Sequence, residues 1–363
     1  MDIATLKTIK SNFVKELQDS ASGKKTSLPF IINQIPTTPL VNNGEIFQAL
    51  VIGGSIYKKA ILKKVKKKLS ILEIENGEQP LFKTAEDLFL FVGKIANPNI
   101  NIISINFAHR IKATVRKNSG NSSKSRIDGI LIGGSKESTL HGLIDKKVGE
   151  EIERYFRKNK KDALVAVAND TICLLLAGLT QYKPIILAGG ADGTGTNFAF
   201  FLDKKNAVNL ESANFDKFPQ SKEGKIIDST SSNRGGWIFE KETSGAYLYK
   251  HFNLIIKERN IDYPQISSTE ELDLVSRKNI PQVSEIANNL LKRSAQLVSC
   301  QIAGITEFKK RGMVFNMEGS LFWKANGYKE TVEETVKQLI PQYKVKFVEI
   351  KDSGILGAAK LVS

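Results

Sequence analysis

Residues 163–203, ALVAVANDTICLLLAGLTQYKPIILAGGADGTGTNFAFFLD, contain two polar motifs that interrupt apolar runs. The first run, Ala163 to Ala168, is rich in small and β-branched residues and predicts a buried strand. It stops at Asn169-Asp170-Thr171, where one of these side chains can cap the apolar helix that follows. A carboxylate is therefore expected at the carboxyl end of a strand, where open α/β folds bind ligands.

The second apolar run, Ile185 to Ala188, leads to Gly193-Thr194-Gly195-Thr196-Asn197. Glycines with neighbouring hydroxyls let backbone N–H groups approach phosphate oxygens. A strand resumes over Phe198 to Leu202, which predicts a glycine-rich turn in a hairpin. Each motif alone also has an ordinary explanation, namely a helix-capping aspartate and a plain hairpin turn.

Together, NDT followed at short range by GTGTN resembles the hexokinase family. In that family the NDT aspartate is the catalytic base, and the GTGTN turn holds nucleotide phosphate. The resemblance implies that Asp170 is the base and that Asn169 and Asp170 bind substrate. It also implies nucleotide contacts from the turn, made by Gly193, Thr194, Gly195 and Thr196. The resemblance spans about residues 28–363, with the motifs in the family's order.

Composition limits the classes of protein. The chain has 363 residues, of which 41% are hydrophobic and 25% charged, enough for two globular domains. No apolar run reaches the length of a membrane span and the start lacks the apolar core of a signal peptide, so we expect a cytoplasmic protein without a membrane partner. Cys173 and Cys300 lie in helix-like apolar contexts and should pack as small hydrophobes. With three histidines, no protein-ligated metal site is predicted.

The net charge of +15 raises the question of nucleic-acid binding. The lysines are scattered, no zinc-finger or RNA-recognition motif occurs, and aromatic residues do not alternate with basic ones, so we expect no nucleic-acid partner. The densest basic run, Lys58 to Lys68, alternates partly with apolar residues and predicts the solvated face of a strand. A general attraction for anionic metabolites follows.

The N-terminal part predicts an amphipathic helix over residues 1–18 and an irregular connector over 19–45. The segment IFQALVIGGSIYKKAIL then predicts a strand, a turn at Gly53-Gly54-Ser55 and a returning strand. In isolation this is an ordinary hairpin. At this place the hexokinase family has its first phosphate loop, which implies nucleotide contacts from Gly53, Gly54, Ser55 and Lys58.

This first loop departs from the family pattern. Val51 stands where the family has an aspartate that orients magnesium, Ser55 replaces threonine, and Lys58 replaces arginine. Serine and lysine keep a hydroxyl and a cation, although lysine lacks the bidentate fork. Val51 offers no ligand atom, so we expect Mg²⁺ to be held loosely.

A helix capped by Thr84 is predicted over 84–97, followed by a strand over 101–107. The strand ends in SINFAH, which resembles the family's sugar loop and implies substrate contacts from Asn106 and Phe107. We expect His109 at the surface.

Residues 129–136, GILIGGSK, resemble the family's strand and TK dipeptide. The resemblance implies that Ser135 and Lys136 bind substrate and that Lys136 also assists catalysis, although an ordinary loop lysine is the alternative. A charged helix is predicted over 146–158.

Sugar-site motifs continue beyond the glycine turn. Asn209-Leu210-Glu211 resembles the family's NTE, and Ile238 to Leu248 resembles YEKxxSGxYLGE. These matches imply that Asn197, Glu211 and Glu240 bind the sugar, because carboxylates and amides can each take a hydroxyl proton. A single glutamate of this kind would otherwise be a salt-bridge partner.

The last third predicts a long helix over 283–310, a strand with a turn at 318–320, a short helix, a strand and a terminal helix. The turn resembles the family's DGS motif and implies that Gly319 and Ser320 contact the nucleotide.

The resemblance implies an α/β fold of the two-domain, actin-like ATPase (ribonuclease H-like) sugar kinase type, with a central cleft. The expected division is 1–43 for the N-terminal helix and connector, 44–168 with 352–363 for a small domain, and 169–351 for a large domain. The implied activity is transfer of the γ-phosphate of ATP, with Mg²⁺, to the 6-hydroxyl of glucose or a similar hexose, in glycolysis, by a monomer or homodimer. Val51 and the altered loop at 106–108 keep open the alternative of a non-catalytic sugar-binding sensor or scaffold.

Overall fold

The computed structural model describes residues 1–53, 56–66, 68–118, 121–133 and 138–363. The chain forms two compact units. The first comprises residues 1–30, 190–198 and 210–348, and the second comprises 31–189, 199–209 and 349–363. These boundaries differ from those of the expected domains, whose division stays a prediction.

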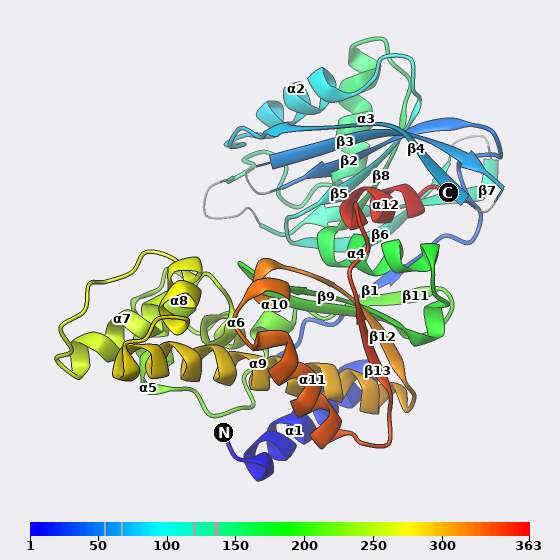
Figure 1. Ribbon diagram of the computed structural model, residues 1–363. Helices are drawn as coiled ribbons and strands as arrows, with labels where there is room; N and C mark the ends of the chain where they lie inside the picture. The colour runs from blue at the N-terminus through cyan, green and yellow to red at the C-terminus, as the bar shows by residue number, and fades with distance from the viewer. Residues whose placement is uncertain (54–55, 67, 119–120, 134–137) are drawn as a thin grey trace. The chain divides into compact units, whose positions relative to one another are not determined.

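The second unit is built on a five-stranded sheet in the order β4 (Lys68–Glu78), β3 (Ile56–Val65), β2 (Ile46–Ile52), β5 (Ile102–Phe107) and β8 (Leu164–Asn169). β2, β5 and β8 run parallel, and β3 pairs antiparallel with β2 and with β4. Helices α2 (Ala85–Ile95) and α3 (Val148–Lys158) cover one face, and α4 (Asp170–Ala177) and α12 (Ser353–Lys360) cover the other (Figure 1).

Alternation along the strands assigns their side chains to these two layers. Leu50, Ile105 and Val167 pack with α2 and α3, whereas Phe47 and Ala166 pack with α4 and α12. By the same alternation the side chains at positions 51 and 106 face the α12 layer, and a Cβ built on Gly354 would meet both.

A buried charge network ties the hairpin of β6 (Ile111–Asn118) and β7 (Asn121–Leu131) to α3. Glu153 Oε2 accepts hydrogen bonds from Arg116 Nη1 at 2.7 Å and Arg126 Nη2 at 2.8 Å, and Arg116 Nε lies 2.6 Å from Asp128 Oδ2. Removing one partner from such a buried set costs about 3–5 kcal/mol, because the remaining charge is left uncompensated.

A second sheet has the order β1 (Ile31–Gln34), β11 (Asn206–Asn209), β10 (Thr196–Phe201), β9 (Leu187–Asp192), β12 (Met313–Glu318) and β13 (Val345–Val348). β9 and β10 each belong partly to both units. Short 3₁₀ turns cover Gly178–Thr180, Pro184–Ile186 and Ser212–Asn214.

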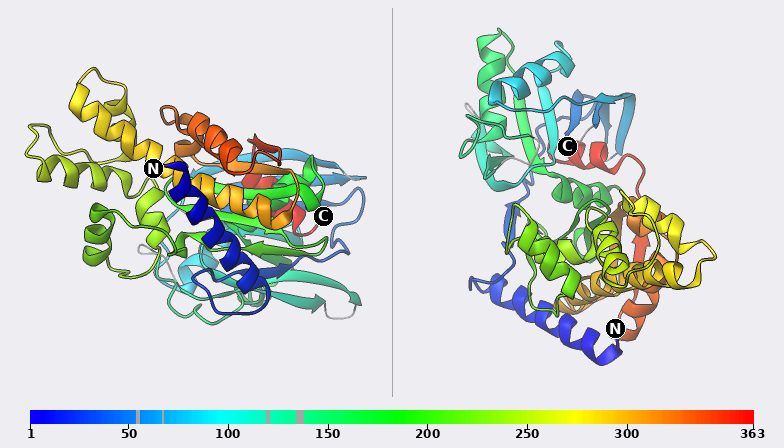
Figure 2. Two further views of the ribbon diagram at one scale, coloured as in Figure 1. Left: turned by 90° about the horizontal axis from the view of Figure 1, so that it is seen from below. Right: turned by 90° about the vertical axis from the view of Figure 1, so that its left-hand side faces the viewer.

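The first unit is rich in helices. They are α1 (Ile3–Ala21), α5 (Lys222–Thr230), α6 (Ile238–Thr243), α7 (Leu248–Glu258), α8 (Thr269–Ser276), α9 (Pro281–Lys309), α10 (Ser320–Lys324) and α11 (Tyr328–Leu339). The N-terminal helix α1 lies along α9 (Figures 1 and 2), where Lys10 pairs with Glu307 and Phe13 packs against Gly304. The predicted amphipathic helix is therefore part of the folded unit.

Most predicted elements are present, including the capped helix at Thr84 and the terminal strand and helix. The connector over 19–45 contains β1, which the prolines around it concealed, and neither β4 nor β6 was predicted. The expectation for His109 is wrong. Its side chain is 6% exposed, and its ring lies 4.6 Å from the ring of Phe107, which is part of the core.

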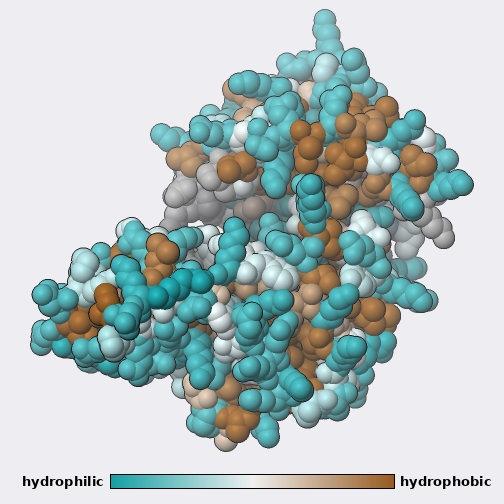
Figure 3. Space-filling view, in the orientation of Figure 1, coloured by the Kyte–Doolittle hydropathy of each residue, from teal (hydrophilic) through white to brown (hydrophobic). Residues whose placement is uncertain are grey.

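Hydrophilic residues cover much of the face in Figure 3, and hydrophobic ones gather over the β3–β4 hairpin. Exposed apolar side chains there include Ile56, Leu72 and Ile74. Among the described helices, none combines the length and apolar character needed to cross a membrane.

Candidate active site

The NDT motif forms the predicted corner between β8 and α4. Asn169 ends the strand and caps the helix, since its Oδ1 accepts from the Thr171 N–H at 2.9 Å. Asp170 is the first helical residue, and its Oδ1 also accepts from the Thr171 N–H, at 2.7 Å. Its side chain reaches solvent, yet the surrounding protein removes enough water from the carboxylate to raise its pKa.

Asn209, which opens the NTE-like motif but was not predicted to bind substrate, lies beside this corner. It ends β11 and is buried, and its Nδ2 donates to Asn169 Oδ1 at 3.1 Å. Asn169 Nδ2 in turn donates to the backbone oxygen of His109 at 3.5 Å. Asn209 brings an amide from a distant strand to the corner, a contact that only the fold reveals.

The predicted sugar loop at the end of β5 brings Asn106 into the same unit. Its Nδ2 donates to the Gly354 backbone oxygen at 3.4 Å, and among the described residues its buried Oδ1 has no hydrogen-bond partner. Such an orphaned acceptor is costly to bury, so a ligand hydroxyl is a fitting partner. The Phe107 side chain is fully buried in the apolar core.

The first glycine turn lies next to this loop. Gly53 has φ +145°, and a Cβ there would come within 2.2 Å of Ala108 Cβ, so the turn requires glycine. Val51 is the register partner of Asn106 in β5 and of Lys58 in β3. It is half-buried against the α12 layer, and Lys58 is exposed.

The remaining predicted residues of this half, Gly54, Ser55, Ser135 and Lys136, lie outside the described residues. Their assigned roles stay predictions.

The second glycine turn belongs to the first unit. Gly245 N donates to the Gly193 backbone oxygen at 2.7 Å, and Ala246 N donates to that of Thr194 at 3.2 Å. Thr194 is exposed and Gly195 partly so, whereas Thr196 is buried. These contacts fix the turn and leave its tip open to a ligand.

Glu240 on α6 lies against this turn. Its Oε2 accepts from the Thr196 N–H at 3.1 Å. Asn197 Oδ1 accepts from the Ser212 N–H at 3.0 Å, so it holds the chain just after Glu211. Glu211 itself has φ +50° and is partly exposed. Three predicted sugar ligands are thus brought near the glycine turn within one unit.

Gly319 also approaches the turn. Its φ is +128°, and a Cβ there would lie 2.0 Å from the Asp192 backbone oxygen, so glycine is required for this approach. Ser320 begins α10 and is exposed. The predicted nucleotide residues Gly193 and Gly319 therefore lie side by side.

Comparisons with known proteins show what the chain as a whole is similar to. A family model described as hexokinase matches residues 257–363. Hexokinase-7 of Oryza sativa subsp. japonica is 24% identical over 93% of this chain and 88% of its own length. The hexokinase of Emericella nidulans is 24% identical over 100% of this chain and 88% of its own. The chain is therefore similar to hexokinases over almost its whole length.

Solved structures confirm the predicted fold class. The hexokinase of Schistosoma mansoni, solved with glucose, superposes with a TM-score of 0.81 at 18% identity, covering 100% of this chain and 95% of that one. A ROK hexokinase from Thermus thermophilus gives a TM-score of 0.57 at 16% identity, covering 88% of this chain and 98% of that one. The chain therefore has the actin-like ATPase fold of sugar kinases.

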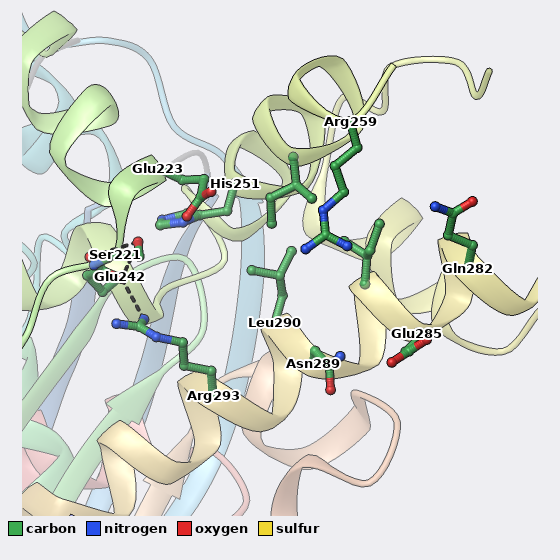
Figure 4. A pocket seen from close by; sticks show the side chains of 12 residues that line it. Ser221, Glu223, Glu242, His251, Arg259, Gln282, Glu285, Asn289, Leu290 and Arg293 are labelled. Carbon is green, nitrogen blue, oxygen red and sulfur yellow. Dashed lines mark hydrogen bonds and ion pairs between the residues drawn. The ribbon is translucent and has the colours of Figure 1, made fainter. Parts of the chain in front are cut away.

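One cavity of the described chain lies apart from the predicted site residues. It measures about 220 Å³ between α5, α6, α7 and α9, and none of its described lining residues was predicted to bind sugar or nucleotide (Figure 4). At one end Glu242 Oε2 lies 2.5 Å from Arg293 Nη1, and Glu242 Oε1 accepts from the Ser221 N–H at 2.7 Å. The buried Glu242 thus links α6, which also carries Glu240, to the partly exposed Arg293 of α9 and to the start of α5.

Proposed function

We propose that the chain is an ATP-dependent hexose kinase that phosphorylates the 6-hydroxyl of glucose or a similar hexose, with Asp170 as general base. The observation that carries this proposal is the solvent-accessible carboxylate at the β8–α4 corner, bordered by Asn169 and Asn209. Similarity to hexokinases supports the same reaction.

The chemistry assigned to Asp170 follows from its surroundings. A base works best when its pKa lies near the operating pH, and partial desolvation raises the pKa of Asp170 in that direction. The carboxylate would take the proton of the sugar hydroxyl as that oxygen attacks phosphorus. A positioned base contributes about 10²–10⁴ in rate, and positioning and electrostatics supply the remainder.

The sugar would be held by amides and carboxylates. Asn106 offers a buried oxygen without a hydrogen-bond partner among the described residues, and Glu211 and Glu240 offer partly exposed carboxylates. Each can accept a sugar hydroxyl proton, and hydrogen bonds to charged groups contribute about 1.5–3 kcal/mol. The open tip of the second glycine turn, with Gly319 beside it, would take nucleotide phosphates.

Magnesium would be held chiefly by the nucleotide. The described residues contain no cluster of three His, Cys, Asp or Glu side chains suited to a metal, and position 51 lacks a carboxylate. Mg²⁺ commonly keeps several waters and binds substrate phosphates with one or two carboxylates, so a phosphate-held ion fits this chain. When bound, the ion neutralises phosphate charge.

A non-catalytic sugar-binding sensor is the second candidate, favoured by Val51 in the first turn. The glycolytic role, the cytoplasmic location and the monomeric or dimeric state expected from the sequence remain predictions.

One assay separates these functions. The protein is mixed with ATP, Mg²⁺ and one of several hexoses, and sugar phosphate is quantified by mass spectrometry. If more moles of glucose phosphate form than moles of protein are present, the protein turns over repeatedly, and the kinase function is supported. Glucose binding by calorimetry without any sugar phosphate supports the sensor.

A further inference from the structure

The cavity between α5, α6, α7 and α9 is lined on the α7 side by three residues spaced four apart, His251, Ile255 and Arg259. Residues at this spacing lie in one row along a helix, and a rise of about 1.5 Å per residue puts the first and last about 12 Å apart. Across the gap, α9 presents Ile286 and Leu290. The cavity therefore has apolar walls in its middle and a nitrogen-bearing side chain toward each end (Figure 4).

His251 is buried at one end of the cavity, where it is 1% exposed. Its Nε2 lies 2.7 Å from the Lys241 backbone oxygen, and because a carbonyl only accepts, Nε2 carries a proton. Burial lowers the pKa of this imidazole, so the ring is neutral at pH 7 and Nδ1 keeps its lone pair. Among the described residues, Nδ1 has no hydrogen-bond partner. This end of the cavity therefore offers a buried acceptor for a donor group of a ligand.

Arg259 supplies a cation at the other end. Its side chain extends from the end of α7 toward Leu290 of α9 (Figure 4), and it is exposed. Within the described part of the chain, no ion pair or side-chain hydrogen bond occupies its guanidinium. Arg293, which also lines the cavity, is instead paired with Glu242. A guanidinium presents its N–H donors in a planar fork that matches a carboxylate, so Arg259 favours a carboxylate at this end.

The size of the cavity and its two ends define one class of ligand. An engineered cavity of about 150 Å³ with apolar walls accepts benzene. The present cavity, at about 220 Å³, therefore has room for a ring with two short substituents. A hydroxyl on one side of the ring can donate to His251, and a carboxylate on the opposite side can pair with Arg259. Ligand sites commonly combine an apolar lining with a few placed polar groups in this way.

The cavity also adjoins the helix that carries a predicted sugar ligand. His251 bonds the Lys241 backbone oxygen of α6, and Glu242 of the same helix lines the cavity. Residues two apart on a helix are turned by about 200° from each other, so Glu240 points away from Glu242. It points to the second glycine turn, where it accepts from the Thr196 N–H. Helix α6 therefore has the cavity on one side and the candidate sugar and nucleotide residues on the other.

We propose that the cavity is a second ligand site, for a small phenolic carboxylic acid, and that its occupancy strengthens sugar binding through His251 and α6. The phenol donates to His251 Nδ1, the ring packs between Ile255 and Leu290, and the carboxylate pairs with Arg259. A ligand that fixes the His251 ring also fixes its bond to the α6 backbone, and with it the position of Glu240. The site itself does not depend on the reaction, whereas the coupling to sugar rests on the proposed kinase function.

Titration calorimetry with 4-hydroxyphenylacetate tests the site. We expect one molecule to bind per chain, and phenylacetate to bind about tenfold more weakly, because it leaves His251 Nδ1 without a partner. Arg259→Gln should weaken binding of 4-hydroxyphenylacetate about tenfold or more, since an ion pair is lost. Lys257→Gln, which removes an exposed cation of α7 outside the cavity, is the matched control and should bind like the native protein. Absence of binding, or native affinity in Arg259→Gln, would overturn the proposal.

Nuclear magnetic resonance can observe the contact with His251 directly, because the chain has only three histidines. Ring nitrogens of ¹⁵N-labelled histidine are recorded in long-range ¹H–¹⁵N spectra, and His251→Asn identifies the signals of His251. Where that variant does not fold, substitution of His109 and His141 in turn identifies them by elimination. 4-Hydroxyphenylacetate should shift the Nδ1 signal of His251 and leave the signals of the exposed His141 in place. An unchanged His251 signal at saturation would overturn the assigned contact.

The coupling is tested by titrating glucose with and without saturating 4-hydroxyphenylacetate. Glucose should bind about threefold more tightly to the occupied protein, and by linkage glucose should tighten binding of 4-hydroxyphenylacetate by the same factor. Arg259→Gln should show neither effect at the same concentration. Equal glucose affinity of the free and the occupied protein would overturn the coupling. If 4-hydroxyphenylacetate binds as expected but the protein neither binds nor phosphorylates glucose, the kinase assignment fails and the cavity site is supported.

Discussion

The two glycine turns of this chain differ in where their carboxylates lie. The first turn, at Gly53, has Val51 where the hexokinase family has an aspartate, and its neighbour His109 is a buried, neutral base. The second turn, at Gly193, has a buried acid beneath it in Asp192. Both turns depend on glycine and on close approach of the backbone. This turn geometry is therefore compatible with different charged residues around it.

The contrast extends to pH. Burial lowers the pKa of His109 to about 4 and raises that of Asp192 to about 7. The surroundings of the first turn should therefore lose stability as pH falls, and those of the second turn as pH rises.

The largest expected effect tests whether either turn serves phosphoryl transfer. Asp170→Asn should lower turnover by about 10²-fold or more, because an amide cannot accept the hydroxyl proton. Glucose affinity should stay within about tenfold, since the amide still forms a hydrogen bond. Steady-state kinetics and calorimetry measure the two quantities. Turnover within threefold of the native value would show that Asp170 is not the general base. The two turns could then not be linked to phosphoryl transfer through this residue.

The acid sensitivity of the first turn is the next effect. His109 binds a proton in the unfolded chain below about pH 6.5 but in the folded chain only below about 4. The free energy of unfolding should therefore fall by about 3 kcal/mol as pH drops through this window. His109→Leu should remove most of that fall in urea titrations, whereas substitution of the exposed His141 by Leu should not. Equal profiles for both variants would contradict the neutral, buried state of His109.

The sugar contact of the second turn should have an effect of similar or smaller size. Glu240→Ala should weaken glucose binding by about 1.5–3 kcal/mol, since a charge-assisted hydrogen bond in a partly desolvated site is lost. It also removes the acceptor of the Thr196 N–H, so ADP binding should weaken as well. Glu285→Ala, on an exposed part of α9, is the control. If calorimetry finds that Glu240→Ala binds glucose with native affinity, Glu240 does not bind the sugar.

The smallest effect concerns the missing carboxylate of the first turn. Val51 is half-buried beside Asn106, with the cationic Lys58 as its register partner. Val51→Asp should raise the initial rate several-fold at low Mg²⁺, about 1 kcal/mol, because a metal-paired carboxylate restores an anchor for the ion. Asparagine has the shape of aspartate without its charge, so Val51→Asn should show no increase in rate at low Mg²⁺. Equal Mg²⁺ curves for all three proteins would mean that the native site already holds the ion fully.

The sequence predicted the elements that carry strong local signals. The β8–α4 corner was predictable because an apolar run, a capping triplet and a second apolar run follow one another. The burial of His109 was not, since it depends on the packing of Phe107 and on the neighbouring backbone. Asn209 meets Asn169 across 40 residues, and Asp192 meets Thr196 beneath a turn, contacts that only tertiary structure creates. Short strands such as β1 contain too few residues for an alternating apolar pattern to be recognised.

The central claim is that this chain transfers phosphate to a hexose through Asp170. The most direct measurement follows ATP, glucose and Mg²⁺ by ³¹P NMR with native protein and with Asp170→Asn side by side. We predict that the native protein converts the γ-phosphate of ATP into a sugar phosphate resonance, and that Asp170→Asn does so at least about 100-fold more slowly while still binding glucose. Release of inorganic phosphate alone, or equal rates for the two proteins, would contradict the account.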